Sequence, residues 1–334
     1  MIRLFGFLLI VISISLGWSW MSYQQSVNSS YISDETGAVV ITINKGDALN
    51  KVVEKLSAKG AVEAKWFKWL VRLEGQANKI QAGEYEFSPG LTPVQILQFL
   101  VKGKVNQYAV SLIEGQTFKQ ILNDLHEHPA IENTLPIKAD MATYLTLLNF
   151  SEKHLEGLLL PETYFFIKGT SDVEIITRAY RSMQAFINTA WLERQQNKDI
   201  KTVYDALILA SIVEKETAVA SERKRIAGLF LRRLEIGMKL QTDPTVIYGM
   251  GDIYQGDIRF RDLRKDTPYN TYTRYGLPPT PIAMPGKASI DAVLHPEKTR
   301  SLYFVSKGNG THVFSETLRQ HNNAVNKYQR KNKK

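Results

Sequence analysis

The sequence ALILASIVEKET at residues 206–217 decides the fold, because it places apolar side chains on every side of a predicted helix, Tyr204–Thr217. A helix that is apolar all round is buried, so this segment predicts the central helix of a folded domain. Its last turn carries Glu214 and Glu216. Burial and the negative end of the helix dipole both favour the neutral form of a carboxyl group there. We therefore expect one of the two glutamates to hold a proton near neutral pH, as a general acid must.

The spacing along this helix does not choose between the two glutamates. Each has apolar or small residues three and four positions before it, so both side chains would meet the predicted core. A bland alternative is a helix end that emerges into water, with Glu214, Glu216 and the nearby Glu222 as ordinary solvated charges. Segments elsewhere in the chain are needed to decide between these interpretations.

Helical and strand-like segments surround the central helix. Two strands are predicted near the C-terminus, joined by a Gly-rich hairpin loop at residues 306–311. This mixture predicts an α+β fold, with a larger mixed α+β domain at residues 108–326. The flanking helices are expected at Met141–Asn149, Asp172–Gln196 and Ser221–Ile236, and the strands at Leu302–Ser306 and His312–Ser315.

Residues 38–107 show a second arrangement of strands and helices. Val39–Ile43 alternates and is rich in β-branched residues, which is typical of a strand, and residues 83–87 form a similar segment. Two helices with apolar periodicity are predicted between them, and we expect Trp66 and Trp69 of the second helix to lie in the core. The order strand, helix, helix, strand resembles a LysM-like βααβ module, a small fold that binds N-acetylglucosamine polymers.

Residues 1–24 are predicted to form a short cytoplasmic stub and a transmembrane helix. Leu4–Met21 contains no charged residue and is long enough to cross a bilayer as a helix. Arg3 precedes this stretch, so the positive-inside rule places the N-terminus in the cytoplasm. A cleaved signal peptide is the alternative. Trp18 and Trp20 lie where an interfacial aromatic belt would, which favours a retained single-pass anchor.

The composition excludes several classes of protein. Of the 334 residues, 44% are hydrophobic and 22% are charged, which is ordinary for a globular chain. The net charge of +9 includes five charges in a basic tail predicted at residues 327–334, and no nucleic-acid-binding motif accompanies the mildly basic remainder. The absence of Cys excludes disulfides and thiolate metal sites. The pair His126 and His128 is too sparse for a metal site, and the polar residues 25–37 predict a tether.

Three further segments place polar groups among apolar ones. Residues 240–245 combine an amide with a carboxylate, and residues 269–273 place aromatic rings beside hydrogen-bonding groups. Upstream, residues 155–166 place Glu156 and Glu162 in an apolar frame. Each segment alone could be a turn with a satisfied polar side chain. Together they indicate a cleft that binds sugars, because aromatic faces and amides are what such ligands meet.

These segments resemble the YceG-like family of endolytic murein transglycosylases over nearly the whole chain. The resemblance implies lytic cleavage of the MurNAc-β-1,4-GlcNAc bond in nascent peptidoglycan, which leaves 1,6-anhydroMurNAc ends and terminates glycan elongation. It implies a single essential glutamate, and the first Glu of the family motif falls on Glu214. No metal and no cofactor is implied. The motifs that carry the resemblance are Leu155–Phe166, Ala210–Thr217, Leu240–Gly249, Tyr269–Pro279, His295-Pro296 and residues 303–305 with 310–314.

The resemblance also implies the contacts to substrate. Two amides match positions that hold sugar groups in other lytic transglycosylases, and two tyrosines would form walls of the cleft. A glutamate and a serine complete the candidate set. The resemblance implies no role for Glu156 or Glu162 beyond shaping the cleft. The candidate substrate-binding residues are, in that order, Gln241 and Asn270, Tyr269 and Tyr272, and Glu162 and Ser211.

The location and partners follow from the same resemblance. A single-pass protein of the inner (plasma) membrane is implied, with its N-terminus cytoplasmic and its catalytic domain periplasmic. Its expected partner is the peptidoglycan glycan strand, with penicillin-binding proteins as candidate protein partners and no nucleic acid. Two other functions stay open. A lysozyme-like muramidase would use similar residues but add water to the cut bond, whereas a non-catalytic peptidoglycan-binding scaffold would use the LysM-like segment alone.

Overall fold

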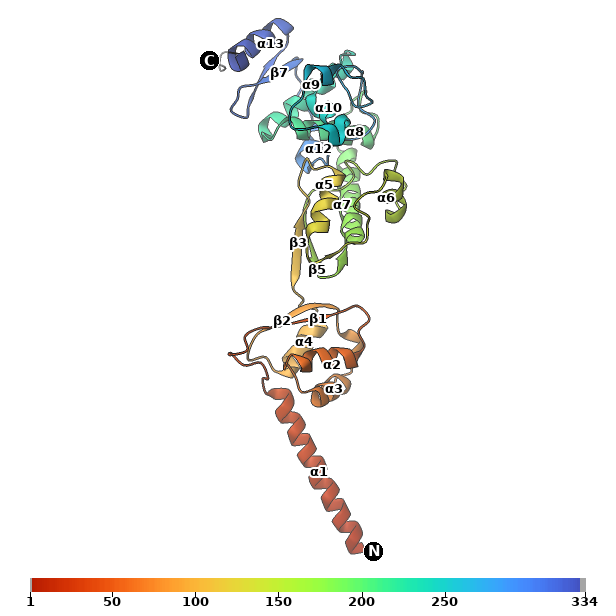
Figure 1. The fold of residues 1–334 in the computed structure, drawn as a ribbon, viewed down its shortest axis with the longest axis vertical. Helices are drawn as coiled ribbons and strands as arrows, with labels where there is room; N and C mark the ends of the chain where they lie inside the picture. Colours follow the sequence, from red (N-terminus) through yellow and green to blue (C-terminus); the bar gives the residue numbers. More distant parts are fainter. Residues whose placement is uncertain (1, 331–334) are drawn as a thin grey trace. The chain divides into compact units, whose positions relative to one another are not determined.

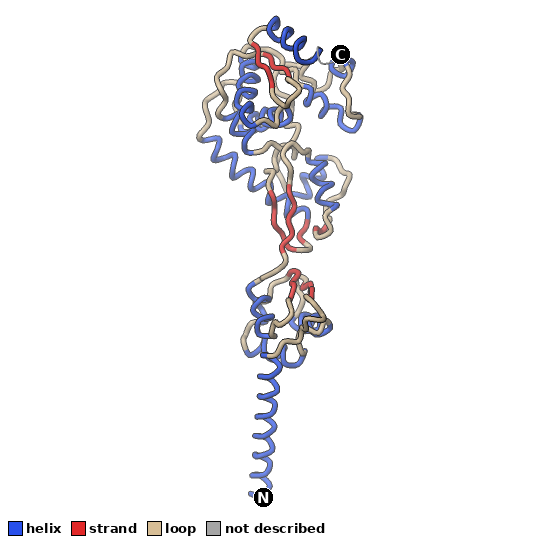
Figure 2. Tube along the Cα trace, turned by 90° about the vertical axis from the view of Figure 1, so that its left-hand side faces the viewer, coloured by secondary structure: helices blue, strands red, loops and turns tan. Residues whose placement is uncertain are grey.

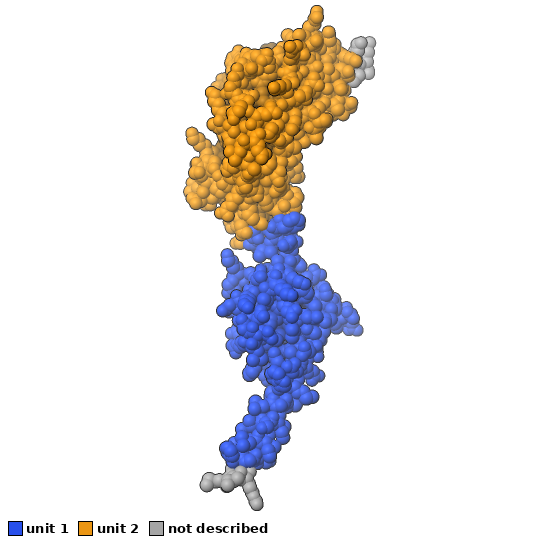
Figure 3. All heavy atoms as spheres, turned by 180° about the vertical axis from the view of Figure 1, so that it is seen from behind, with its two compact units in different colours: residues 1–108, 165–170 blue, residues 109–164, 171–334 orange. Residues whose placement is uncertain are grey.

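The computed structural model describes residues 2–330, which form a mixed α+β fold (Figures 1 and 2). The chain divides into two compact units (Figure 3): unit 1 comprises residues 1–108 and 165–170, and unit 2 comprises residues 109–164 and 171–334. The strands of the described residues form four two-stranded sheets, which pair β1 with β2, β3 with β5, β4 with β6 and β7 with β8. The predicted mixture of helix and strand is therefore present, but no sheet in this part of the chain is large.

Unit 1 begins with α1 (Ile2–Asn28), the helix at the N-terminus in Figure 1. From Phe5 onward this helix is long and apolar enough to cross a membrane, and a signal sequence would pass the same test. The large apolar side chains from Phe7 to Trp20 are exposed, so no protein contact covers them. This is the pattern expected of a helix that meets lipid.

The predicted tether at residues 25–37 begins inside this helix. α1 continues to Asn28, and Val27 and Ile32 are buried in the core of unit 1 together with Tyr23. The Tyr23 ring meets Trp66 edge-on, with ring centroids 6.1 Å apart. The reason is that apolar side chains are interspersed among the Ser and Asn residues and reach the core. The start of this segment is therefore packed against unit 1, which differs from the free linker that its polar composition predicted.

The body of unit 1 follows the predicted order. Its strands pair antiparallel, from Val39 opposite Phe87 to Ile43 opposite Gly83, and their alternate side chains enter the core. Three helices share the core with this two-stranded sheet. The elements are β1 (Val39–Ile43), α2 (Leu49–Ala58), α3 (Ala64–Leu73), β2 (Gly83–Phe87) and α4 (Pro93–Lys102).

Helix α3 corrects one detail of the sequence analysis. Trp66 packs against the core as expected, but Trp69 is 54% exposed. The inward face of this helix is occupied by Phe67, Leu70 and Val71, which lie at the i, i+3, i+4 spacing of a buried stripe. Trp69 falls outside that stripe and faces solvent, so the prediction that it lies in the core is wrong.

Unit 2 contains most of the helices. The division of the chain between the two units falls within three strands, which are β3 (Gln107–Ser111), β5 (Thr163–Ile167) and β6 (Thr170–Ser171). The remaining elements are α5 (Phe118–Glu127), β4 (Ile131–Glu132), α6 (Met141–Leu148), α7 (Asp172–Leu192), α8 (Val203–Glu216), α9 (Arg223–Glu235), α10 (Asp243–Met250), α11 (Phe260–Arg264), α12 (Lys287–Leu294), β7 (Tyr303–Ser306), β8 (His312–Ser315) and α13 (Leu318–Val325).

Helix α8 is the centre of unit 2. Every residue from Ala206 to Val213 is buried, as its sequence predicts. Helices α7, α9 and α12 supply the surrounding apolar side chains, including Met183, Phe230 and Ile290. Thr202 begins α8 with a capping box, in which its hydroxyl accepts a hydrogen bond from the backbone of Asp205. The helix is therefore fixed at its start by a cap and along its length by packing.

Several elements of unit 2 depart from the sequence analysis. Residues 240–245 do not form a simple turn, because Asp243 and Pro244 open helix α10. Proline at the first helical positions favours helix initiation, since the amide that it lacks has no partner there. Helices α11, α12 and α13 were not predicted. The predicted basic tail, residues 327–334, begins within a π-helical turn at Asn326–Arg330, and its last four residues lie outside the described part of the chain.

Candidate active site

The carboxyl group of Glu214 lies at the C-terminal end of α8 in a nearly closed position. Its side chain is only 7% exposed. The backbone N–H of Gly286 donates to it at 2.9 Å, and the guanidinium of Arg223 lies 4.0 Å away. The carboxyl group of Glu214 is thus shielded from solvent between a backbone donor and a cation.

The Gly286 donor belongs to the start of another helix. Gly286 is the N-cap of α12, so its N–H lies at the positive end of that helix. Backbone bonds tie the preceding loop to residues 114–116: the Gly115 N–H donates to the Met284 oxygen at 2.8 Å, and the Met284 N–H donates to the Gln116 oxygen at 2.7 Å. These two bonds bring the segment before α5 to the end of α8.

A second glutamate, Glu114, enters the site on this segment. A Cβ atom added to Gly286 would lie 1.9 Å from Oε1 of Glu114, so the carboxyl group rests against the glycine. Burial raises the pKa of Glu114, the charge of Glu214 raises it further, and Arg223 opposes both. The sequence analysis missed Glu114 because an exposed Glu-Gly turn before a helix is common. The sequence signal that could have marked it is its place directly before a helix with a capping box, α5, in unit 2.

Glu216, two residues after Glu214 and the last residue of α8, lies in a different environment. The hydroxyl of Thr242 donates to its carboxyl group. Burial raises the pKa of Glu216 and Asp243 adds to the effect, whereas the bond from Thr242 and the charges of His312 and Arg233 lower it. The buried carboxyl group expected at this helix end thus describes Glu216 as well as Glu214.

His312 connects the C-terminal hairpin to this region. Its backbone N–H donates to Glu222 at 2.9 Å, and its ring Nδ1 lies 2.7 Å from the other carboxylate oxygen. Burial alone would raise the pKa of Glu222, but these bonds to His312 lower it overall. The pair holds strand β8 against the start of α9, where Arg223 faces Glu214.

Glu162 lies beside the same end of α12. Its carboxylate forms an ion pair with Lys287, the residue after Gly286. Its backbone oxygen accepts the N–H of Leu112 at 3.0 Å, which fixes the segment that leads to Glu114. Of the predicted site residues, Glu162 is therefore the one that the structure brings to the N-terminus of α12 together with Glu214.

Ser211 lies in the interior one turn before Glu214. It is fully buried, its hydroxyl donates to the Ile208 oxygen at 2.7 Å, and it accepts the N–H of Ile282 at 3.0 Å. These two bonds use the hydroxyl to hold the 282–286 loop against α8. We call Glu214 and Glu114, which both lie beside Gly286, the carboxyl cluster. Ser211 lies behind this cluster and has no exposed atom to meet a ligand.

Replacing Ser211 by Ala is expected to lower the free energy of unfolding by about 1–3 kcal/mol, because the Ile282 N–H would stay buried without a partner. Ser289 offers a matched control. It is equally buried, but within the described residues its hydroxyl has no hydrogen-bond partner, so Ser289→Ala is expected to cost less than about 0.5 kcal/mol. Urea unfolding of both variants measures the difference, and equal losses would contradict the assignment.

Asn270 is also placed in the interior. Its amide nitrogen donates to the backbone oxygens of Leu263 at 3.1 Å and Lys265 at 2.7 Å, and its amide oxygen accepts the N–H of Tyr272 at 2.8 Å. The side chain is fully buried. Every polar atom of the amide is thus engaged with the loop around it. Asn270 shapes the loop that carries Tyr269 and Tyr272.

Gln241 and Tyr272 lie near Glu216. Gln241 directly precedes Thr242, whose hydroxyl donates to Glu216, and Tyr272 bonds to the next residue, Asp243. Gln241 is exposed and has a φ of 49°, a left-handed conformation that is uncommon outside glycine. Its backbone N–H donates to the Thr271 oxygen at 3.2 Å, and the Tyr272 hydroxyl donates to Asp243 at 2.5 Å. Strained backbone is often kept at functional sites. The Gln241 side chain is exposed just before α10.

A groove of about 840 Å³ contains Tyr269 and Glu156. Tyr248 meets Tyr269 edge-on at 4.9 Å between centroids, and its hydroxyl donates to Glu156 at 3.0 Å. Glu156 also accepts the N–H of Phe118 at 3.0 Å, and burial raises its pKa to about 7 against these two bonds. Aromatic walls with a few buried polar groups are typical of small-molecule and sugar sites.

The lining of the groove continues the segment that carries Glu114, because Thr117 and Phe118, at the start of α5, belong to it. Of the predicted site residues, Tyr269 lies in this groove, whereas Glu214 lies at the end of α8 beside Gly286.

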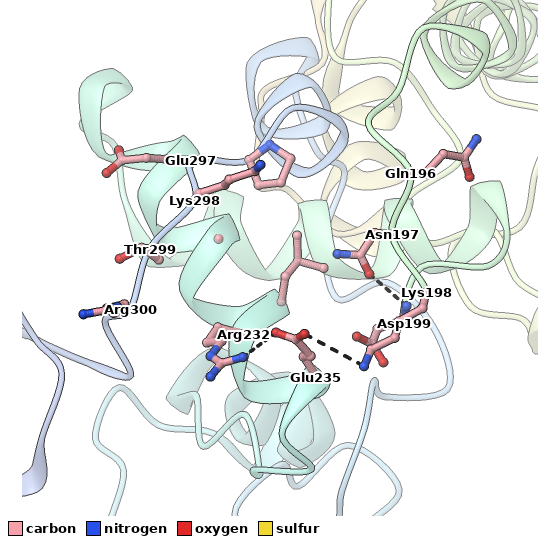
Figure 4. A pocket seen from close by; sticks show the side chains of 13 residues that line it. Gln196, Asn197, Lys198, Asp199, Arg232, Glu235, Glu297, Lys298, Thr299 and Arg300 are labelled. Atoms are coloured by element: carbon pink, nitrogen blue, oxygen red, sulfur yellow. Dashed lines mark hydrogen bonds and ion pairs between the residues drawn. The ribbon is translucent and has the colours of Figure 1, made fainter.

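A separate depression of about 560 Å³ is shown in Figure 4. It lies between α9 and the segments 196–199 and 296–300. Glu235 pairs there with Arg232 at 2.6 Å and with Lys198 at 3.9 Å. None of the predicted site residues lines it.

The fold and the site together define a class: an α+β protein whose buried core helix ends in a carboxyl cluster facing the start of a second helix. The model of the YceG-like family matches residues 41–327. The chain belongs to the YceG-like family.

Relatives of known name support this assignment. The chain is 33% identical over 324 residues to an endolytic murein transglycosylase of Bacillus subtilis (strain 168), covering 92% of this chain and 89% of that protein. It is 27% identical over 335 residues to a protein of the same name from Streptococcus pneumoniae serotype 2 (strain D39 / NCTC 7466), covering 90% of this chain and 60% of the relative. A crystal structure of a yceG-like protein from Listeria monocytogenes matches with a TM-score of 0.55 and 33% identity, over 86% of this chain and 99% of that one.

Proposed function

We propose that this protein is a peptidoglycan transglycosylase of the lytic type, which cuts MurNAc-β-1,4-GlcNAc bonds in glycan strands. The name shared by its relatives supports an enzyme that acts on murein. The single observation that carries the proposal is the carboxyl group of Glu214, which is 7% exposed and lies between an N–H donor and Arg223. A glycosidic bond needs such a group to protonate its oxygen.

Glu214 acts twice in the proposed reaction. As the neutral acid it gives its proton to the glycosidic oxygen, the bond from C1 to that oxygen breaks, and the GlcNAc hydroxyl leaves. The resulting carboxylate then takes the proton of the C6 hydroxyl of the same MurNAc, whose oxygen bonds to C1. The product is a 1,6-anhydro ring, no water is consumed, and Glu214 ends with its proton restored.

One acid suffices because the nucleophile belongs to the substrate. Most glycosidases need a second carboxylate to activate water or to attack C1. A well-oriented internal hydroxyl reaches effective molarities of about 10⁵–10⁸ M, which lowers the barrier by about 7–11 kcal/mol. The enzyme must mainly hold the ring in the bent conformation. We assign that task to Gln241, Tyr272 and Glu162 near the carboxyl cluster, and to Tyr269 in the aromatic groove.

The same proposal covers location and binding outside unit 2. We propose that α1 is a single-pass anchor with the N-terminus in the cytoplasm, which holds the catalytic domain on the outer side of the inner membrane where nascent strands appear. The positive-inside pattern and the uncovered apolar surface of α1 support this. The βααβ order of unit 1 supports a LysM-like module that binds the glycan. Penicillin-binding proteins, which supply those strands, are the proposed protein partners.

Analysis of the products tests the function directly. Incubated with purified uncrosslinked glycan strands, the full-length protein in detergent is expected to release fragments ending in 1,6-anhydroMurNAc, observed by mass spectrometry. Fragments heavier by one water would identify a lysozyme-like muramidase instead. Binding without any cleavage across the pH range would identify a non-catalytic scaffold, and both results would overturn the proposal.

A further inference from the structure

We propose that helix α3 is a second membrane contact, which lies on the surface of an anionic bilayer with Trp69 and Leu73 among the lipid headgroups. The inference goes beyond the proposed reaction and rests only on the proposed anchor, α1. It begins from an apolar surface that unit 1 leaves uncovered, since Trp69 is 54% exposed and Leu73 is 59% exposed. Single exposed apolar residues are normal, so their arrangement on the helix is what matters.

Helix α3 has an apolar stripe besides the one that faces the core. Trp66, Trp69 and Leu73 follow one another at i, i+3 and i+7, which is the spacing of one helix face. A surface helix of a globular domain needs one apolar stripe, and the buried residues of α3 already supply it. The second stripe therefore indicates that α3 meets an apolar phase outside the protein.

This second stripe adjoins the end of the apolar part of α1. Trp20 and Met21 are exposed, whereas Tyr23, two residues later, is buried in unit 1. The centroid of the Tyr23 ring lies 5.4 Å from that of Trp20 and 6.1 Å from that of Trp66. In Figure 1, α3 lies beside the C-terminal end of α1. Because the polar region of each leaflet is about 5–8 Å thick, a bilayer around α1 would bring its headgroups to this face of α3.

The charges beside the second stripe favour anionic lipid. Lys65, Lys68 and Arg72 are also spaced at i, i+3 and i+7, so they form a basic stripe next to the apolar one. Long basic side chains place their stems along apolar surface and their charges at headgroup level. The acidic neighbours, Glu63 and Glu74, lie at the two ends of the helix. A basic stripe beside an apolar one is typical of helices that lie on anionic membranes.

Spin labels on the full-length protein in bilayers test this contact. The chain contains no Cys, so Leu73→Cys creates a single labelling site on the stripe. In bilayers of phosphatidylglycerol and phosphatidylcholine, a nitroxide at residue 73 is expected to collide more often with oxygen, which dissolves in lipid, than with a water-soluble nickel complex. Val40→Cys, an exposed apolar position on β1, is the control and should favour the nickel complex.

Removing the basic charges tests the choice of lipid. Lys68→Gln and Arg72→Gln, each added to the labelled protein, are expected to lower the ratio of docked to undocked α3 about fivefold in anionic bilayers. Lys45→Gln, an exposed change beyond β1, is the control for the loss of a charge and should leave the ratio unchanged. Equal ratios in all three variants would contradict the role of the basic stripe.

The outcomes separate this inference from the proposed function. A label at residue 73 that meets the nickel complex as often as one at residue 40 overturns the lipid contact. Protection of residue 73 that appears only when soluble N-acetylglucosamine oligomers are added also overturns it, because the stripe would then bind glycan. Should Leu73→Cys not fold, as judged by circular dichroism, Trp69→Cys gives a second site on the same stripe. A protein that an alkaline carbonate wash releases from the bilayers overturns the proposed anchor itself, and product analysis tests the reaction independently of both.

Discussion

Replacing Glu214 by Gln is expected to lower the rate of anhydro-product release by at least about a hundredfold, because general acid catalysis contributes about 10²–10⁴-fold. The amide has the shape of the acid but no proton to give. It can still accept the N–H of Gly286, which donates at 2.9 Å, so the fold around α12 should be kept. The measurement is the initial rate on uncrosslinked glycan strands, with circular dichroism to confirm that the variant is folded.

Glu216→Gln is the matched control on the same helix. Its carboxyl group accepts a hydrogen bond from Thr242, and an amide oxygen can accept that bond as well. The rate is therefore expected to stay within about tenfold of the wild type, at least ten times above that of Glu214→Gln. The reverse ranking, with Glu216→Gln inactive and Glu214→Gln active, would move the acid role to the buried glutamate whose pKa is raised by burial.

The parts of the fold that sequence predicts are those that local periodicity determines. Helix α8 is apolar on all sides, and a helix of this kind has no stable place except a core, so its position follows from residues 206–213 alone. The strands β1 and β2 likewise follow from local pattern, although their pairing is known only from the structure. Helix α12 escaped prediction although α6, of the same length, was predicted: α6 begins after Asp140, whose side chain caps it, whereas α12 begins after Gly286 with no side-chain cap to mark its start.

The site is harder to predict because it is made by contacts between distant segments. Glu214 meets Gly286, 72 residues later, and Glu114 meets the same glycine from 172 residues before it. No local pattern contains these distances. Polar residues raise a second difficulty: the amide of Asn270 looks available in sequence, but backbone oxygens of a folded loop use it completely. Only the loop geometry distinguishes a satisfied side chain from one that is open to a ligand.

Unit 2 contains a buried carboxylate, that of Asp172, which accepts several hydrogen bonds. Asp172 begins α7 and is fully buried. It accepts backbone N–H groups from Thr134 at 3.0 Å, Leu135 at 2.9 Å and Val173 at 2.7 Å, and the His126 ring lies 3.1 Å away. Burial would raise the pKa of Asp172, but the bonds from Thr134, Leu135 and Val173 lower it overall. The charged form is thus the one that the fold holds.

Asp172→Asn is expected to lower the free energy of unfolding of unit 2 by about 3 kcal/mol at neutral pH, since an amide has one acceptor oxygen for several buried donors. The folded-state pKa lies below the unfolded value near 3.8, so the stabilisation is complete above that value and is lost as the pH falls through the folded pKa. The difference between wild type and variant should therefore shrink in acid. Hydrogen exchange of α7 amides, measured against urea, gives the free energy at each pH. Glu174→Gln, an exposed change in the same helical turn, is the control and should cost less than about 0.5 kcal/mol. An Asp172→Asn variant that matches this control at neutral pH would show that the backbone donors do not depend on the charge.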